Sequence, residues 1–510
     1  MKNRTILFYF TWQLRPVHHG IVIEKLHSLL EENKDANIHF LICTGQMKPC
    51  YTNRTGDSGQ CKVCSFHSNA ALSQFGDRLK VVTINEPESE FKNEFKYNSI
   101  QEIKDIVYRN VKIGYGALSS YISFTRNLEP EFDENFRSYF DSLLSNQINL
   151  TNRIIDLYEL HNYESIIFFN GRTADTRPLY DISRNFSIPF ISLELIKKSD
   201  TNYFINEFPN CLPHDIEYHH KRLMETWDNS SMSLEEKIES GSRFFENRRN
   251  GVLTRDRRVY TAHQIQNLLP DDWDNSKKNV AIFNSSEDEF AAIGDIFEMK
   301  AIFNSQEIGL IKILEYFKHD SDFVFYFRIH PNLASVKYQY HLRLYNLENK
   351  YKNLRIIGPK DKVSTYAMID SADKIIVFGS TVGVEATYWN RPTILLAGSF
   401  YYHLDAAYKP KTFEELISLL RDNELLPKNK VDAIKYGFYM MNYTQYTRQN
   451  KFSPKPLRIF GINLGLVHNH LKLLGSSTLF KIIEFLLKRW TQLFSSKKCS
   501  IPVQENLNAT

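Results

Sequence analysis

The chain has 510 residues, which exceeds the size at which one hydrophobic core keeps growing, so two large domains are expected. Its 42% hydrophobic and 24% charged residues are ordinary for a folded soluble protein, and its net charge of +4 is too small to favour a nucleic-acid partner. The apolar run at residues 6–10 is too short for a signal-peptide core, and no uncharged apolar stretch is long enough to span a membrane. We therefore expect a cytoplasmic protein whose chain does not cross a bilayer.

The first elements follow a strand, turn and helix pattern. Residues 4–10 predict a strand, and the turn at residues 16–20, which carries His18 and His19, leads into a helix. A second strand is expected at residues 38–43. This is an opening of Rossmann type, in which the first turn lies at the functional edge of the sheet. The two histidines are either site residues or solvated residues at the start of a helix.

A cysteine-rich insertion at residues 43–67 follows the second strand. It holds four of the six cysteines of the chain, at Cys43, Cys50, Cys61 and Cys64. The last two have the C-x-x-C spacing that lets two thiolates bind one metal ion, and structural disulfides are disfavoured in a reducing cytoplasm. The sequence leaves two alternatives open, which are a structural zinc ion and free or redox-active thiols.

A β-α-β pattern then places polar residues at strand ends. The strand predicted at residues 165–169 ends in Asn170 and Arg172, and the strand predicted at residues 189–194 ends in Glu194. The carboxyl ends of parallel strands form the functional edge of such a sheet. Arg172 is either a contact for a ligand or the partner of Asp175 or Asp181 in a salt bridge.

The second half of the chain repeats the strand and helix alternation. Residues 200–275 carry no strand signal and include a charged helix at 230–250, and a linker is expected at residues 270–276. Strands are then predicted near residues 280, 323, 354, 375 and 393. We therefore predict an α/β protein with one domain at residues 1–270, a second at 271–450 and a tail at 451–510.

Two runs in this second domain carry chemistry. Asp322 to Pro331, DFVFYFRIHP, is a buried strand that delivers Arg328 and His330 to its carboxyl end. Lys374 to Ala386, KIIVFGSTVGVEA, ends in a glycine-bearing turn with Ser380, Thr381 and Gly383 and continues into a helix that carries Glu385. Cationic side chains, hydroxyl groups and backbone N–H groups at a helix start suit an anionic phosphate. Each motif alone is also common as ordinary structure.

The pair of motifs resembles the C-terminal half of GT-B glycosyltransferases, in particular the capsule polysaccharide biosynthesis group that includes Kdo transferases. A third segment, VAIFNSSEDE at residues 280–289, lies where such proteins begin their donor-binding domain. The resemblance covers roughly residues 279–400. It implies two Rossmann-like domains that face a cleft. The sequence departs from the family pattern because its first loop lacks a Gly-Gly pair.

The resemblance also implies roles for individual residues. Nucleotide-sugar contacts are implied for Arg328, His330, Asn284, Ser285, Ser286, Ser380, Thr381 and Gly383, and contacts with the ribose hydroxyls for Glu385. Acceptor contacts are implied for Asn170 and Arg172. The candidates for the catalytic base are His18, His19 and Glu194, because a base must reach the acceptor hydroxyl through the cleft.

The activity implied is transfer of a sugar from a nucleotide-sugar donor onto a bacterial surface polysaccharide, either capsule or O-antigen. The acceptor would be a lipid-linked or polymeric glycan, and no cofactor or metal would be needed for catalysis. One alternative is a sugar-nucleotide epimerase with the same architecture. Another is a non-catalytic scaffold of a polysaccharide-assembly complex.

The tail carries an amphipathic pattern. Residues 478–494, TLFKIIEFLLKRWTQLF, place apolar residues around most of a helix and leave a narrow polar stripe. Basic residues surround this segment, at Lys472, Lys488, Arg489, Lys497 and Lys498. We expect peripheral attachment to the anionic inner face of the bacterial inner membrane. The alternative is that this helix packs on the first domain.

Overall fold

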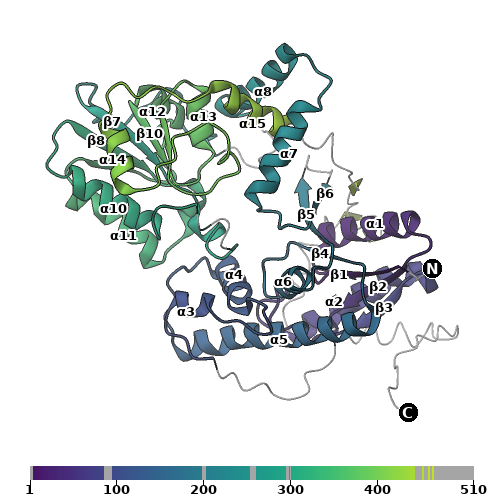
Figure 1. Ribbon diagram of the computed structural model, residues 1–510. Coiled ribbons are helices and arrows are strands. Elements are labelled where there is room, and N and C mark those ends of the chain that lie inside the picture. The colour runs from purple at the N-terminus through teal and green to yellow at the C-terminus, as the bar shows by residue number, and fades with distance from the viewer. Residues whose placement is uncertain are drawn as a thin grey trace.

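The computed structural model describes residues 4–84, 95–197, 203–252, 260–294, 298 and 300–442, and the backbone at 451–452, 458–459 and 462–463. These residues form two α/β units, each built around its own sheet (Figure 1). The expected architecture of two Rossmann-like units is therefore confirmed.

The sheet of the first unit has seven strands in the order β12-β6-β5-β4-β1-β2-β3. Its strands are β1 (Thr5–Tyr9), β2 (Asn37–Ile42), β3 (Lys80–Thr83), β4 (Ser165–Phe169), β5 (Phe190–Lys197), β6 (Tyr203–Pro209) and β12 (Lys451–Phe452). Strands β1 to β5 pair in parallel, whereas β6 and β12 are antiparallel to their neighbours. The strand order reverses at β1, so the crevice beyond β1 and β4 is the expected ligand side of this sheet.

Strand β6 corrects the expectation that residues 200–275 hold no strand. Its sequence, YFINEFP, has no continuous β-branched run, and proline ends it. The strand exists because it pairs with β5 over seven residue pairs. A ladder of this kind depends on the neighbouring strand, which the local pattern does not show.

Helices cover both faces of the first sheet. They are α1 (Pro16–Glu32), α2 (Ser58–Leu72), α3 (Ile100–Lys104), α4 (Ile113–Thr125), α5 (Glu134–His161) and α6 (Arg177–Asn185), with a 3-10 turn η1 (Ser73–Arg78). Three of these helices begin at a side chain that accepts a backbone N–H, at Asp57, Ser99 and Asp133. Such caps satisfy N–H groups that have no partner inside the helix.

The second sheet has five parallel strands in the order β11-β10-β7-β8-β9. Its strands are β7 (Lys278–Phe283), β8 (Phe323–Arg328), β9 (Leu354–Ile357), β10 (Lys374–Val377) and β11 (Thr393–Leu395). All five strands predicted in this half are confirmed. The chain runs outward from β7 to β9 on one side and returns to β10 on the other, so the order reverses between β7 and β10. The carboxyl ends of these two strands therefore flank a crevice.

The second unit has helices on both faces of its sheet. They are α10 (Gln306–Phe317), α11 (Gln339–Lys350), α12 (Thr365–Ser371), α13 (Val382–Tyr388), α14 (Phe413–Arg421) and α15 (Lys430–Asn442). Two 3-10 turns, η2 (Glu287–Glu289) and η3 (Pro331–Ser335), directly follow β7 and β8. These turns bring polar side chains to the crevice.

Helices α7 (Ile216–Asp228) and α8 (Leu234–Arg249) precede the predicted linker but lie against the second unit (Figure 1). Trp227, Phe244 and Phe245 belong to the same apolar cluster as the second sheet. Helix α8 also crosses α15 closely, since a Cβ atom at Gly241 would lie 2.4 Å from the carbonyl oxygen of Ile434. The boundary at residue 270 stays a prediction, but the core of the second unit includes these two helices.

The chain returns to the first unit at β12, which pairs with β6. Beyond it, the described backbone forms a two-stranded hairpin of β13 (Arg458–Ile459) and β14 (Ile462–Asn463). The amphipathic helix expected at residues 478–494 lies outside the described residues. None of the described helices combines the length and the apolar character that a membrane span requires.

Candidate functional site

A cavity of about 420 Å³ lies where the carboxyl ends of β7, β8 and β10 meet helix α8 and strand β6. We call it the interunit cavity. Eight of the nine residues expected to bind a nucleotide-sugar line it, namely Asn284, Ser285, Ser286, Arg328, His330, Ser380, Thr381 and Glu385. Aromatic residues line it as well, among them Tyr260 and Tyr366. Segments far apart in the sequence, from Asn206 to Met440, thus form one cavity.

Arg328 is a buried cation at this cavity. Its side chain donates to the carbonyl oxygens of Val363 at 2.7 Å and Asp361 at 3.3 Å, and the residue is only 3% exposed. Within the described part of the chain it forms no ion pair, and its Nε has no hydrogen-bond partner. Burial lowers the pKa of the guanidinium to about 10, so the group remains charged at neutral pH. A buried charge without a counter-ion is costly, and an anion in the cavity would compensate it.

His330 follows β8 and is held on two sides. Its backbone N–H donates to Asn284 Oδ1 at 2.7 Å, and its Nδ1 accepts the backbone N–H of Asn332 at 3.2 Å. The Tyr260 ring meets the imidazole edge to face, with centroids 5.0 Å apart. The imidazole is thus positioned by its neighbours at the wall of the interunit cavity.

Glu385 is 2% exposed and has two partners that the sequence did not reveal. Its carboxylate accepts Arg248 Nε at 3.0 Å and the Tyr366 hydroxyl at 2.6 Å. Arg248 also donates to Thr381 Oγ1 at 3.4 Å, so it links the glycine-bearing turn to the helix that follows. Burial and the neighbouring carboxylate raise the pKa of Tyr366, which keeps its hydroxyl a donor. The basic end of α8 was visible in sequence, but its contact with Glu385 was not.

The turn between β10 and α13 depends on its glycines. Gly379 has a φ of +81° and a Cβ there would lie 2.7 Å from the Gly398 carbonyl oxygen, so both its conformation and its surroundings require glycine. Gly383, expected to contact the ligand, instead packs beneath the turn, where a Cβ would lie 2.3 Å from the Tyr401 hydroxyl. Gly383 does not line the interunit cavity and serves close packing.

In the first unit, Asn170 and Glu194 lie together at the sheet edge. Asn170 Nδ2 donates to Glu194 Oε2 at 2.8 Å, and Glu194 pairs with Asn206 across the β5–β6 ladder. Asn206 lines the interunit cavity, and its Oδ1 has no hydrogen-bond partner among the residues that the structure describes. Asn206 was not singled out from sequence, because it belongs to the strand that the sequence did not predict.

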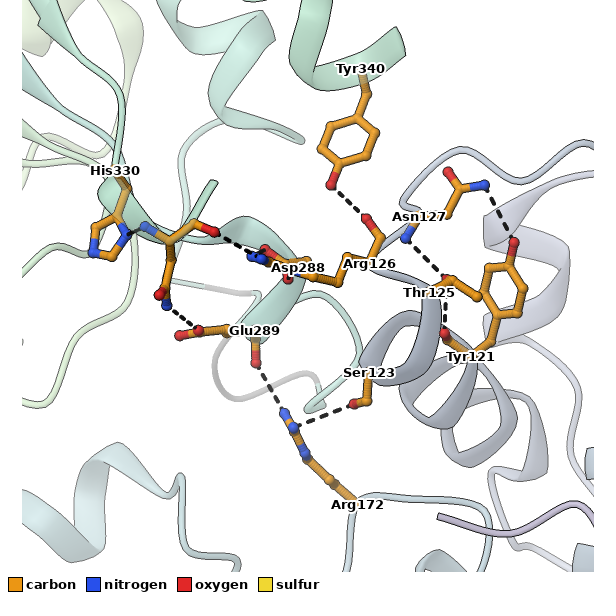
Figure 2. Close-up of polar contacts among 11 residues, drawn as sticks. Tyr121, Ser123, Thr125, Arg126, Asn127, Arg172, Asp288, Glu289, His330 and Tyr340 are labelled. Atoms are coloured by element: carbon orange, nitrogen blue, oxygen red, sulfur yellow. Dashed lines mark hydrogen bonds and ion pairs between the residues drawn. The ribbon is translucent and has the colours of Figure 1, made fainter. Parts of the chain in front are cut away.

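Arg172 reaches across to the second unit (Figure 2). It donates to the backbone oxygen of Glu289 at 3.0 Å and to Ser123 Oγ at 3.5 Å. The carboxylate of Asp175 instead accepts hydrogen bonds from the hydroxyl groups of Thr11 and Thr173. The contacts of Arg172 therefore join the two units, and in the described structure it forms no salt bridge to Asp175 or to Asp181, which pairs with Arg177.

The two predicted histidines of the first turn lie in an aromatic cluster. The ring of His18 is 5.3 Å from Trp12 and 5.5 Å from Phe169, and His19 stacks on Phe10 at 6.4 Å. Burial, with a smaller contribution from His67, lowers the pKa of His19 to about 4. Neither histidine lines the interunit cavity.

The four clustered cysteines line one small cavity of about 20 Å³. The backbone N–H groups of Gly45 and Met47 each donate to Cys43 Sγ at 3.4 Å. Burial raises the pKa of Cys50 to about 12 and also raises that of Cys64, so both thiols are protonated at neutral pH. Over the described residues, no three His, Cys, Asp or Glu side chains are arranged to hold a metal ion. The cysteines gather as expected, while the zinc ion itself stays a prediction.

No protein-family model and no curated protein matches the sequence. Among solved structures, the chain is similar to KpsC beta Kdo 2,4 transferase of Thermosulfurimonas dismutans, with 12% identity, 54% of this chain and 79% of that chain covered, and a TM-score of 0.35. KpsC beta Kdo 2,7 transferase of the same organism has 15% identity, with 58% of this chain and 89% of that chain covered, and a TM-score of 0.31. UDP-GlcNAc 2-epimerase from Neisseria meningitidis bound to UDP-GlcNAc has 11% identity, with 95% of this chain and 100% of that chain covered, and a TM-score of 0.20. Since related folds host different reactions, the activity of this chain depends on its own cavity residues.

Proposed function

We propose that the protein is a glycosyltransferase that takes a sugar from a nucleotide-sugar and adds it to a bacterial surface polysaccharide. The observation that carries this proposal is Arg328, a buried cation at the wall of the interunit cavity that forms no ion pair with any residue the structure describes. A nucleotide phosphate is an anion of the size and charge that would compensate it. The volume of about 420 Å³ is within the range of small-molecule sites.

Sugar transfer breaks the bond between the anomeric carbon and a phosphate oxygen, and negative charge develops on the departing phosphate. Arg328, His330 and Thr381 line the cavity and provide a cation and polar groups for that charge. Preorganised groups that meet the developing charge stabilise the transition state more than the ground state. Because the chain itself supplies positive charge there, we propose that transfer needs no metal ion.

We assign Glu385 to the ribose hydroxyls. Its bonds to Arg248 and Tyr366 fix the carboxylate and offset its charge, and a carboxylate still has lone pairs to accept further hydroxyl groups. The role thus remains compatible with both internal partners. Arg248 then positions Glu385 and the Thr381 hydroxyl together.

Of the three candidate bases, we favour Glu194. None of the three lines the interunit cavity, but Glu194 is held by Asn170 and pairs across the β5–β6 ladder with Asn206, which does line it, whereas His18 and His19 make ring contacts with aromatic residues of the first unit. A base has to reach the acceptor hydroxyl directly or through one water. We propose that the acceptor, a lipid-linked or polymeric glycan, enters from this side.

The test is a screen of purified full-length protein against CMP-, UDP-, GDP- and dTDP-sugars, with release of nucleotide as the readout. We expect turnover of one donor class that is lost in Arg328→Met and retained in Arg78→Met, a surface control that pairs with Glu31. Conversion of the free sugar-nucleotide to an epimer would instead identify an epimerase. Absence of both turnover and nucleotide binding would refute the proposal and favour a scaffold.

Two further proposals rest on sequence alone. The protein attaches to the cytoplasmic face of the inner membrane through residues 478–494, where a lipid-linked acceptor would be found. The cysteine cluster binds a structural zinc ion, for which Cys43, Cys50, Cys61 and Cys64 would have to lose their protons. Elemental analysis of protein purified without a histidine tag should give about one equivalent of zinc, and less than about a tenth would leave free or redox-active thiols as the explanation.

A further inference from the structure

Arg126 of the first unit contacts the turns that follow β7 and β8 in the second unit (Figure 2). Its Nε and Nη2 donate to the two carboxylate oxygens of Asp288 at 2.6 and 3.1 Å. Its Nη1 donates to the backbone oxygen of Asn332 at 2.8 Å, and its own carbonyl accepts the Tyr340 hydroxyl at 2.6 Å. One arginine therefore holds three segments of the other unit.

The backbone of Arg126 adopts a conformation that arginine rarely takes. The residue follows the last turn of α4 with a φ of +62°, where its N–H donates to the Ile122 carbonyl. Helices often end in this left-handed conformation, and glycine is the residue usually found there. A strained position that carries a large, fully engaged side chain points to a use for that side chain.

Asn332 connects Arg126 to the interunit cavity. Its carbonyl accepts Arg126, its side-chain amide donates to Glu289 Oε1 at 2.7 Å, and its backbone N–H donates to His330 Nδ1 at 3.2 Å. Figure 2 shows these contacts as one continuous series from Arg126 to the imidazole. Both Glu289 and His330 line the interunit cavity.

This contact determines which nitrogen of His330 carries the proton. A neutral imidazole has one N–H donor and one acceptor nitrogen. Because Nδ1 accepts the Asn332 N–H, the proton resides on Nε2, and Nε2 becomes a donor. A donor is what a phosphate oxygen requires, whereas the other tautomer would present a lone pair at Nε2.

We propose that Arg126 is a positioning residue that acts through Asn332 to keep His330 in the Nε2–H tautomer. The contact between the two units thus prepares the chemistry of the interunit cavity. The inference rests on the proposed function only in taking a phosphate as the group that meets Nε2–H. The tautomer itself is a property of the unliganded protein and can be measured without a substrate.

The experiment is ¹⁵N NMR of the full chain labelled at histidine, with His330 assigned from the signal missing in His330→Gln. We compare the wild type with Arg126→Gly and Arg126→Lys. Glycine removes the guanidinium and suits the left-handed backbone, so the helix end is preserved. Lysine keeps the charge but cannot form the same fork of hydrogen bonds. The matched control is Arg343→Met, which breaks a different contact between the units, at 2.7 Å from Arg343 to Glu129.

We expect the wild type and Arg343→Met to show only the Nε2–H tautomer, Arg126→Gly to show both tautomers, and Arg126→Lys to lie between. Nucleotide binding in Arg126→Gly should weaken by about tenfold, the effect expected for one charge-assisted hydrogen bond. A wild-type Nδ1–H tautomer, or unchanged tautomers in both Arg126 variants, would overturn the proposal. Equal changes in Arg126→Gly and Arg343→Met would also overturn it, since the cause would then be general loosening of the interface. A correct tautomer pattern without nucleotide binding would refute the proposed function alone.

Discussion

Replacement of Arg328 by methionine separates a binding role from a folding role. Burial lowers the pKa of the guanidinium to about 10, and this shift corresponds to about 3 kcal/mol against the charged form in the folded protein. Methionine removes that penalty. It also leaves the Val363 and Asp361 carbonyls without a donor, at roughly 1–3 kcal/mol each. The two effects offset to within about 3 kcal/mol, so Arg328→Met is expected to fold.

The pH dependence of the Arg328 burial penalty lies outside the neutral range, so the wild type and Arg328→Met can be compared directly. The unfolded chain binds the Arg328 proton more tightly than the folded one, so stability would rise with pH only in a window that begins at about pH 10. Below that window the penalty is constant. Thermal unfolding of wild type and Arg328→Met can therefore be compared at any pH near neutrality.

Ligand binding should respond quite differently. A hydrogen bond to a charged group contributes about 1.5–3 kcal/mol, so Arg328→Met should weaken nucleotide binding by roughly 10- to 150-fold. Isothermal titration with nucleoside mono- and diphosphates measures this directly, with Arg78→Met as the control for loss of a surface charge. Wild-type affinity in Arg328→Met, or failure of this variant to fold, would refute the reasoning and make Arg328 a residue of the core.

Three other outcomes are expected. Arg248→Met should lower the melting temperature, because it leaves the buried carboxylate of Glu385 without its cation, which costs about 3–5 kcal/mol of stability. The double variant with Glu385→Gln should recover much of this loss. Glu287→Gln should raise the melting temperature at pH 8 but not at pH 5. The reason is that burial raises the pKa of Glu287 to about 7, so stability is lost as pH rises from about 4.5 through 7. Deletion of residues 472–510 should abolish sedimentation with anionic vesicles, and equal binding by the truncated chain would contradict membrane attachment through that segment.

Much of the second unit could be predicted because its signals are local. The strands before Asn284, Arg328 and Gly379 are continuous apolar runs, and each run ends where polar or glycine residues begin. Parallel strands bring their carboxyl ends to one edge, so residues at those ends were expected to meet, and eight of nine do line one cavity. Gly383 is the exception, because a glycine at the second position of a helix can serve close packing as well as ligand binding, and here it packs against the Tyr401 hydroxyl.

The residues that escaped prediction come together only across the fold. Arg248 ends a charged helix that looks solvent-exposed in sequence, yet α8 crosses to the second unit and places it against Glu385. Asn206 depends on a strand defined by its partner β5. The contacts of Arg126 depend on a left-handed backbone conformation at the end of α4. A glycine at this position would have indicated that conformation from the sequence, whereas an arginine does not.

The sequence alone thus determined the two α/β units, the order of strands along the second half and the ends at which polar groups collect. Those features follow from the alternation and length of apolar runs, which act between neighbours in the chain. The tertiary structure decided which distant groups meet: Arg248 with Glu385, and Arg126 with both Asp288 and the carbonyl oxygen of Asn332. Each of these contacts joins segments whose approach depends on helix crossing and unit docking, and no local pattern records that geometry.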